Sequence, residues 1–189
     1  LLDALGPVSG IDEQYLHVGV SQQLLFSETL IGGPLHPNAS RPLTLQLIYA
    51  GLLSSGSPSS LACFHWFLSL AVLTLVVQIG HQYFGRWTTG VLAAGMLGLS
   101  TTIQESVGQA ASDIPTALAV LAAMDAAVRK RIRTGTIAAA TAFSIKYTAA
   151  APLLGVLVAS RLPLRQTIAV SSLMMLLVSP WWVRNALEG

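Results

Sequence analysis

The sequence predicts an all-α fold, a polytopic transmembrane helical bundle with interfacial amphipathic helices in its first external loop. The 189 residues are 53% hydrophobic and only 10% charged, and their mean hydropathy is +0.65. Soluble domains carry about a quarter charged residues. Several apolar runs also approach the length of about 20 residues that a membrane helix needs. Together these features indicate an integral membrane protein.

Composition and motifs also exclude some classes. The small net charge of +2 argues against a nucleic-acid-binding protein. The single cysteine, Cys63, excludes an intrachain disulfide and a cysteine-based metal cluster. The chain starts at Leu1 without a basic and apolar leader, so we expect no signal peptide and a cut through a longer protein at both ends. Soluble-type nucleotide chemistry is unsupported, because no phosphate-cradling glycine loop is present.

The first 60 residues differ in composition from the rest. They are rich in Gly, Pro, Ser and His, and residues 16–25 place apolar side chains at helical spacing. This pattern predicts an amphipathic helix in the membrane interface, with a second one at 43–53. We therefore expect 1–60 to form an external loop and 61–189 to form a bundle of about four to six membrane helices.

The bundle segments follow in order. Residues 61–80 suit one span, 87–103 suit a span of small residues, and 114–128 form a shorter, Ala-rich span. Pro152 interrupts the long run 134–160, which crosses once or forms a broken helical hairpin bent near 149–152. The last span, 166–183, ends with Trp181 and Trp182 in the position of an interfacial aromatic belt.

Basic residues predict the orientation. The "RKRIR" cluster at 129–133 should be cytoplasmic, which places 81–86 on the same side and 104–113 outside with 1–60. A hairpin at 134–160 returns Arg161 and Arg165 to the cytoplasm, and we favour it over a single crossing. The polar residues that then share the non-cytoplasmic face are Asp12, Glu13, Glu105, Asp113 and Arg184.

Three acidic residues are candidates for catalysis. Asp12 and Glu13 either form a solvated pair in which Asp12 caps a helix, or supply a general base with or without a metal. Asp113 precedes Ile-Pro, a strong signal that it caps a helix with Pro115 in the first turn. An ionisable group at the edge of a span is also a functional candidate.

Cationic residues are candidates for phosphate binding. Lys146 lies about 18 Å along a helix from Thr134, so it needs a partner such as a lipid phosphate or Asp113. His36 and Arg41 in "HPNASRPL" either belong to a stiff exposed loop or grip a phosphate at the membrane surface.

Two histidines fall within one predicted helix. His65 and His81 are about 24 Å apart along it, so they cannot share one haem or metal. Either one could ligate a haem or a chlorophyll-like pigment, but hydrogen-bonded packing is the commoner role of a lone histidine in a span.

The order of five motifs resembles the N-terminal part of a polytopic GT-C glycosyltransferase. This superfamily includes protein O-mannosyltransferases and the aminoarabinose transferases of lipid A. The resemblance covers essentially the whole chain. Its motifs are "DEQY" at 12–15, "HPNASRPL" at 36–43, "SDIP" at 112–115, "FSIKYTA" at 143–149 and "PWWVRN" at 180–185.

The resemblance implies a membrane enzyme that transfers a sugar from a polyprenyl-phosphate donor. Asp12 or Glu13 would be the catalytic base, and Asp113 would face it and share a divalent metal ion with Asp12. The donor phosphate would be bound by Lys146, Arg41, Arg184, His36 and Tyr147. The resemblance further implies a bacterial inner membrane location, with 1–60 on the non-cytoplasmic side in contact with membrane lipid.

The chain also departs from that pattern. The transmembrane helix expected before Leu1, the later helices and the soluble C-terminal domain of many relatives are missing from the sequence. An alternative is a non-catalytic accessory subunit of a respiratory or photosynthetic membrane complex, packed against other membrane protein subunits, with His65 as a pigment ligand. A transporter is disfavoured because the sequence has no internal repeat.

Overall fold

The computed structural model describes residues 17–27, 43–56, 59–107 and 110–188, and in these ranges the chain is helical without a strand. The predicted all-α fold is therefore confirmed for the described residues. Its elements are α1 Val20–Ser27, α2 Thr44–Ser55, α3 Ser59–Phe84, α4 Trp87–Gly98, α5 Thr101–Val107, α6 Asp113–Val128, α7 Ile132–Ile145, the 3₁₀ helix Tyr147–Ala149, α8 Ala150–Ser160 and α9 Leu164–Glu188.

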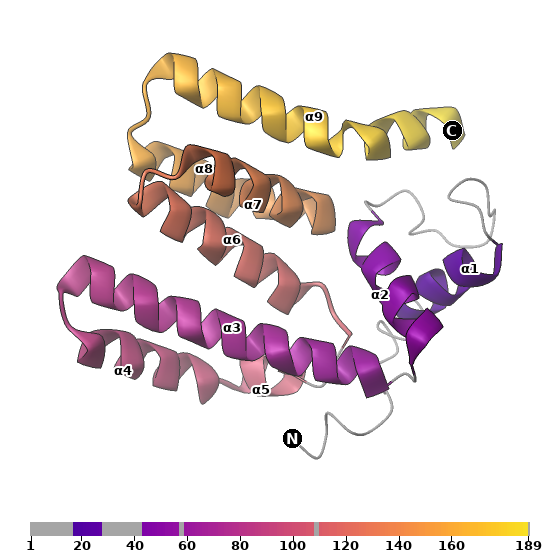
Figure 1. Ribbon diagram of the computed structural model, residues 1–189, viewed down its shortest axis with the longest axis horizontal. Helices are drawn as coiled ribbons and strands as arrows, with labels where there is room; N and C mark the ends of the chain where they lie inside the picture. The colour runs from indigo at the N-terminus through magenta and orange to yellow at the C-terminus, as the bar shows by residue number, and fades with distance from the viewer. Residues whose placement is uncertain (1–16, 28–42, 57–58, 108–109, 189) are drawn as a thin grey trace.

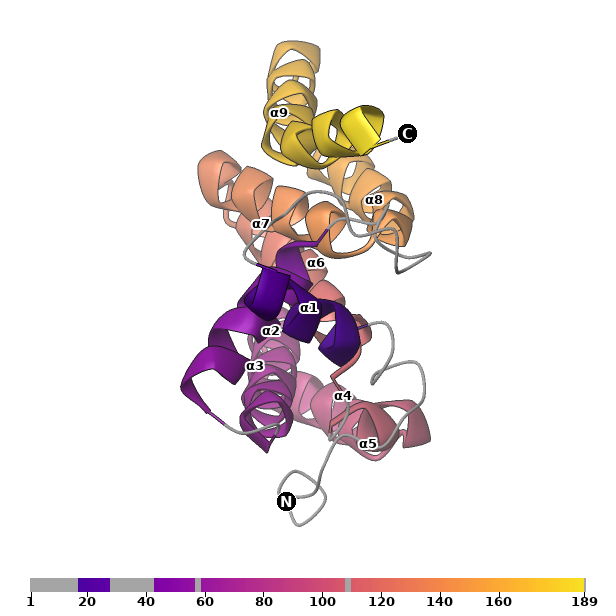
Figure 2. The ribbon, with the colours of Figure 1, turned by 90° about the vertical axis from the view of Figure 1, so that its right-hand side faces the viewer.

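The long helices stack from α4 and α3 at one edge, through α6, to α7, α8 and α9 at the other (Figures 1 and 2). The turns α3–α4, α6–α7 and α8–α9 all lie at one end of this stack, on the left in Figure 1. We call it the basic end, because its turns carry Arg86, four cations within 129–133, Arg161 and Arg165. The opposite end, called the Asp113 end, holds α1, α2 and the start of α6.

Glycines allow α3 and α4 to pack in backbone contact. A Cβ on Gly90 would meet the backbone oxygen of Val77 and would lie 2.8 Å from its Cα, and a Cβ on Gly80 would lie 2.5 Å from the Cα of Gly90. The turn between the two helices passes through Gly85, whose φ of +68° suits glycine. Small residues at such crossings are typical of helix packing in membranes.

Alanines form the core between α6, α7 and α8. Their small side chains let helices approach closely, as the Ala-rich composition of these segments predicts. The buried members of this cluster are Ala119, Ala123, Ala139, Ala142, Ala149 and Leu153.

Two predicted segments divide differently in the structure. The prediction of one helix over 87–103 is wrong, because α4 ends at Gly98 and α5 starts at Thr101. Ser100 lies at the restart, and its hydroxyl oxygen accepts a long hydrogen bond of 3.4 Å from the Ile103 N–H, in the position of an N-cap. The run 134–160 is interrupted at Lys146, ahead of the expected bend at 149–152.

Pro152 follows this interruption and does not lie at it. It lies in the first turn of α8, where its missing N–H would have no helical partner in any case. Helix α7 ends at Ile145, and Lys146 separates it from the 3₁₀ helix that leads into α8.

Within the described residues, two helices are long and apolar enough to cross a membrane, α3 over Ser59–Phe84 and α9 over Leu164–Arg184. Within their apolar windows only 28% and 11% of residues are buried inside the protein. Their exposed side chains include large apolar ones, among them Phe67 and Leu176 at 63% and 66% exposure. An apolar surface of this kind is typical of contact with lipid or with another protein.

Candidate functional site

An ion pair at the Asp113 end joins two candidates that lie 33 positions apart in the sequence. Lys146 Nζ donates a hydrogen bond to Asp113 Oδ1 at 2.6 Å. The side chains are 40% and 62% exposed, so a ligand can reach both of them. Of the two partners predicted for Lys146, the structure supplies the acidic residue.

Asp113 is the first residue of α6, and it does not cap that helix. Ser112 occupies the cap position without a side-chain hydrogen bond, while the Asp113 carboxylate accepts from Lys146. The prediction that Asp113 caps α6 is therefore wrong. Its negative charge still favours the helix, because the first turn of an α-helix carries a partial positive charge. Buried Ile114 and Pro115 anchor this turn.

Lys146 interrupts the helical path with a single extended residue, at φ −149° and ψ 119°. Its N–H donates to the Ala142 carbonyl at 3.0 Å and ends α7, and its carbonyl accepts from the Ala149 N–H at 3.0 Å in the following 3₁₀ turn. Both backbone polar groups of Lys146 are thus satisfied, as a site near lipid requires.

A buried polar cluster, which we call the Tyr49 cluster, supports both ends of the ion pair. Tyr49 and His65 are fully buried, and the Tyr49 hydroxyl is hydrogen-bonded to His65 Nε2 and lies 3.3 Å from the Ala111 carbonyl oxygen. Ala111 is two residues before Asp113, and Ile145, next to Lys146, packs against the hydrophobic cluster to which Tyr49 also belongs. Packing from both directions therefore positions the two charged residues.

We expect Tyr49→Phe to lower the free energy of unfolding by about 1–3 kcal/mol. The substitution leaves His65 Nε2 and the Ala111 carbonyl buried without this partner. Chemical unfolding of the purified protein, followed by circular dichroism, measures the change. Tyr83→Phe is the matched control, because Tyr83 is 55% exposed and its change should stay within about 0.5 kcal/mol. Equal effects of the two variants would contradict this role of the cluster.

The last turns of α9 also belong to the Asp113 end (Figure 1). Trp181 Nε1 donates to Thr44 Oγ1 at 3.0 Å, which joins α9 to the start of α2. Arg184, one turn further along α9, is 8% exposed. Tyr147, predicted to bind the donor phosphate, is 37% exposed, and its ring centroid lies 5.4 Å from that of Phe143.

Four other predicted site residues, Asp12, Glu13, His36 and Arg41, lie outside the described residues. Of the two residues predicted to hold a metal ion, Asp12 and Asp113, the structure therefore describes Asp113 alone. Within the described part of the chain, no group of three or more His, Cys, Asp and Glu side chains is placed to hold a metal ion.

The two histidines of α3 take part in packing. His65 belongs to the Tyr49 cluster, and His81 stacks on Trp87 across the α3–α4 turn, with ring centroids 4.0 Å apart. These contacts favour the packing interpretation over a pigment or haem ligand.

Sequence reasoning missed Tyr49 and Asp125. Asp125 lies inside the apolar segment 114–128 and accepts hydrogen bonds from Arg129 Nε at 2.9 Å and from Gln82 Nε2 at 3.0 Å. The signal for it was available, since a carboxylate four residues before an arginine on a helix predicts an ion pair.

In the part of the chain that the structure describes, the fold is helical, two helices are long and apolar enough to cross a membrane, and an accessible carboxylate–lysine pair lies at one end. Comparison of the chain with protein families, with curated proteins and with solved structures found no match.

Proposed function

We propose that the chain is the N-terminal part of a polytopic GT-C glycosyltransferase that uses a polyprenyl-phosphate sugar donor. The observation that carries the proposal is the Asp113–Lys146 ion pair. It holds a lysine at a helix break within reach of ligands, next to a carboxylate at the head of another helix. A cation fixed in this way can exchange its carboxylate partner for a donor phosphate.

The distribution of charge supports the membrane placement. Seven of the ten Lys and Arg residues of the sequence lie at the basic end. Because cytoplasmic loops of membrane proteins are enriched in Lys and Arg, we place this end in the cytoplasm and the ion pair at the non-cytoplasmic face. A polyprenyl chain would then lie in lipid, with its phosphate beside Lys146.

The proposed reaction is a displacement at the anomeric carbon of the sugar. The acceptor hydroxyl oxygen attacks this carbon, the bond to the phosphate oxygen breaks, and the phosphate leaves with the bonding electrons. The acceptor proton passes to Asp12 or Glu13. Lys146 and Arg184 stabilise the negative charge on the leaving phosphate, which is a large contribution in catalysis of this type.

A metal ion has no assigned step in this proposal. Asp113 is the one carboxylate of the described residues at the ion pair, and it is already bound to Lys146. A divalent metal shared by Asp12 and Asp113 remains a prediction of the resemblance.

The second candidate function is a non-catalytic membrane subunit. The observation in its favour is the exposed apolar face of α9, of whose spanning window only 11% is buried. Another subunit could cover this face. His65 Nε2 is already hydrogen-bonded to the Tyr49 hydroxyl, which argues against His65 as a pigment ligand in such a subunit.

Donor turnover distinguishes the two candidates. The full protein, purified from its membrane, is incubated with polyprenyl-phosphate sugar and a membrane lipid extract, and the released polyprenyl phosphate is measured by mass spectrometry. We expect release by the wild-type protein and its loss in Asp12→Asn. Absence of donor binding, together with stoichiometric co-purification of other membrane subunits, would instead support the accessory subunit.

A further inference from the structure

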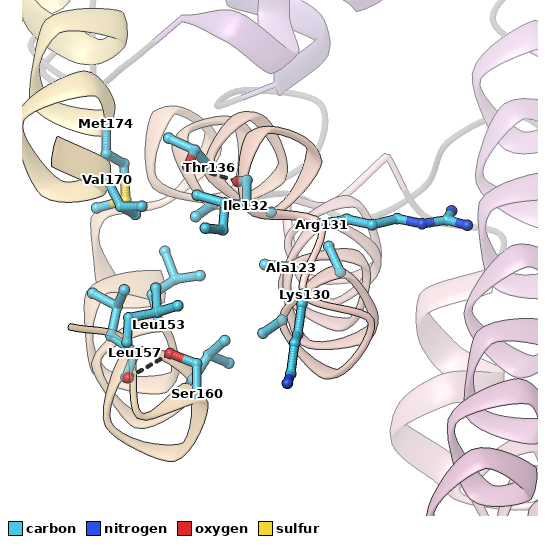
Figure 3. Close-up of a pocket in the computed structure, with 16 residues that line it drawn as sticks. Ala123, Lys130, Arg131, Ile132, Thr136, Leu153, Leu157, Ser160, Val170 and Met174 are labelled. Carbon is cyan, nitrogen blue, oxygen red and sulfur yellow. Dashed lines mark hydrogen bonds between the residues drawn. The ribbon is translucent and has the colours of Figure 1, made fainter. Parts of the chain in front are cut away.

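The basic end contains a cavity that the proposed reaction does not use. It has a volume of about 50 Å³ between α6, α7, α8 and α9, and apolar side chains including Leu153, Val170 and Met174 line it (Figure 3). Lys130 and Arg131 are also at its edge. Figure 3 shows the Arg131 side chain pointing away from the cavity, whereas Lys130 extends beside it on the side of α8.

A larger groove adjoins this cavity. Its volume is about 460 Å³, which is within the range of about 300–1,000 Å³ for ligand pockets. It lies between α6 and α8 and reaches Tyr83 at the end of α3. Its walls are mainly apolar, and it shares Ala127, Lys130, Val156 and Ser160 with the cavity. Lys130 therefore lies where the apolar cavity and the apolar groove meet.

The charge at this end is unbalanced. Within the described ranges, Asp125 is the carboxylate of this end, and Arg129 and Gln82 already bind it. Lys130 makes no ion pair with any described residue. The positive charge of Lys130 therefore favours binding of an anion. The apolar groove beside it favours binding of an apolar chain.

The backbone conformation of Lys130 is a second indication. The N–H groups of Lys130 and Arg131 donate to the Ala127 and Ala126 carbonyls at 3.0 and 2.8 Å, the pattern of a Schellman turn. Lys130 occupies its left-handed position with φ +55°, where glycine is usual. A lysine held in this costly conformation indicates a role for its side chain.

We propose that this groove binds an acidic phospholipid of the cytoplasmic leaflet. Lys130 binds the headgroup phosphate, and an acyl chain lies between α6 and α8. Basic pockets between membrane helices on the cytoplasmic side suit such headgroups. The proposal rests on the membrane placement given above and is independent of sugar transfer.

Lipid binding by the purified full protein in detergent tests the proposal. Native mass spectrometry compares phosphatidylglycerol with phosphatidylcholine of the same acyl chains. We expect phosphatidylglycerol to bind more tightly because its headgroup carries a net negative charge, and Lys130→Gln to weaken its binding about fivefold while weakening that of zwitterionic phosphatidylcholine less. Arg165→Gln is the control, because it removes the same charge from the same end but does not line the groove. Equal losses in the two variants would overturn the specific role of Lys130.

A groove-filling variant tests the acyl-chain part. A Cβ on Gly155 meets nothing within 4 Å, so Gly155→Trp can enter the groove without a backbone clash. We expect it to reduce binding of both lipids at this site. Gly95→Trp is the control, since Gly95 is equally open but lies on α4, outside the groove. Unchanged lipid binding in a folded Gly155→Trp protein would overturn the proposal.

Lys130→Gly, which relieves the backbone conformation, provides a folded variant if Lys130→Gln does not fold.

Discussion

Lys146→Ala is expected to lower the rate of sugar transfer by about a hundredfold or more. The lysine is the accessible cation at the α7–α8 break, and its hydrogen-bonded distance of 2.6 Å to Asp113 shows how closely it approaches an anionic oxygen. Removing one donor that stabilises charge in a transition state costs about 10²–10³ in rate. The measurement is release of polyprenyl phosphate by the full protein under saturating donor.

The stability of the same variant separates catalysis from structure. The two side chains of the pair are 40% and 62% exposed, and ion pairs of this kind contribute about 0–1 kcal/mol. We therefore expect Lys146→Ala to unfold nearly as the wild-type protein does. Lys146→Arg, which keeps the positive charge, should recover part of the activity. Equal activity of the alanine variant and the wild-type protein would exclude Lys146 from donor binding.

Gly90→Ala is expected to lower the free energy of unfolding by about 1–3 kcal/mol or more. The added methyl group would meet the backbone of Val77 on α3, and backbone atoms cannot move aside as a flexible side chain can. Overpacking of a close interface costs about this much. Unfolding of the detergent-solubilised protein in increasing denaturant measures the effect.

Gly95→Ala is the matched control on the same helix, and its expected effect has the opposite sign. A Cβ at Gly95 meets nothing within 4 Å. Alanine is favoured over glycine inside a helix by about 0.5–1 kcal/mol, so this variant should be slightly more stable than the wild-type protein. If both substitutions destabilise equally, the close α3–α4 approach at Gly90 is not what limits stability.

The sequence carried enough information to predict the helical class and most of the helical segments. Hydrophobic runs and small residues are local signals, and α3, α6 and α9 follow them closely. The division of 87–103 was not predicted because the apolar pattern continues through Ser100, where the only local sign of a helix start is one hydroxyl that accepts from the Ile103 N–H. Periodicity does not report a single hydrogen bond.

The members of the candidate site were predictable, and the pairing of Asp113 with Lys146 was one of two predicted alternatives, but the geometry of the pair was not predictable. Asp113 and Lys146 are conspicuous because each is an ionisable residue in or beside an apolar run. Their pairing depends on the extended conformation of Lys146 and on the packing of Ile145 against the Tyr49 cluster. Both are long-range effects of helices brought together by the fold. Tyr49 itself gave no sequence signal beyond a tyrosine in an apolar helix.

The lengths of the broken helices have a consequence for the surrounding bilayer, on the proposed membrane placement. α7 has 14 residues and α8 has 11, so they extend about 21 and 17 Å. The hydrocarbon core of a bilayer is about 30 Å thick, and α3, with 26 residues, extends about 39 Å. Local thinning of the bilayer on the α7–α8 side of the protein is one way to match these short helices. Lipids with short acyl chains relieve this mismatch. Membrane thickness should therefore affect how readily a lipid-linked substrate reaches Lys146.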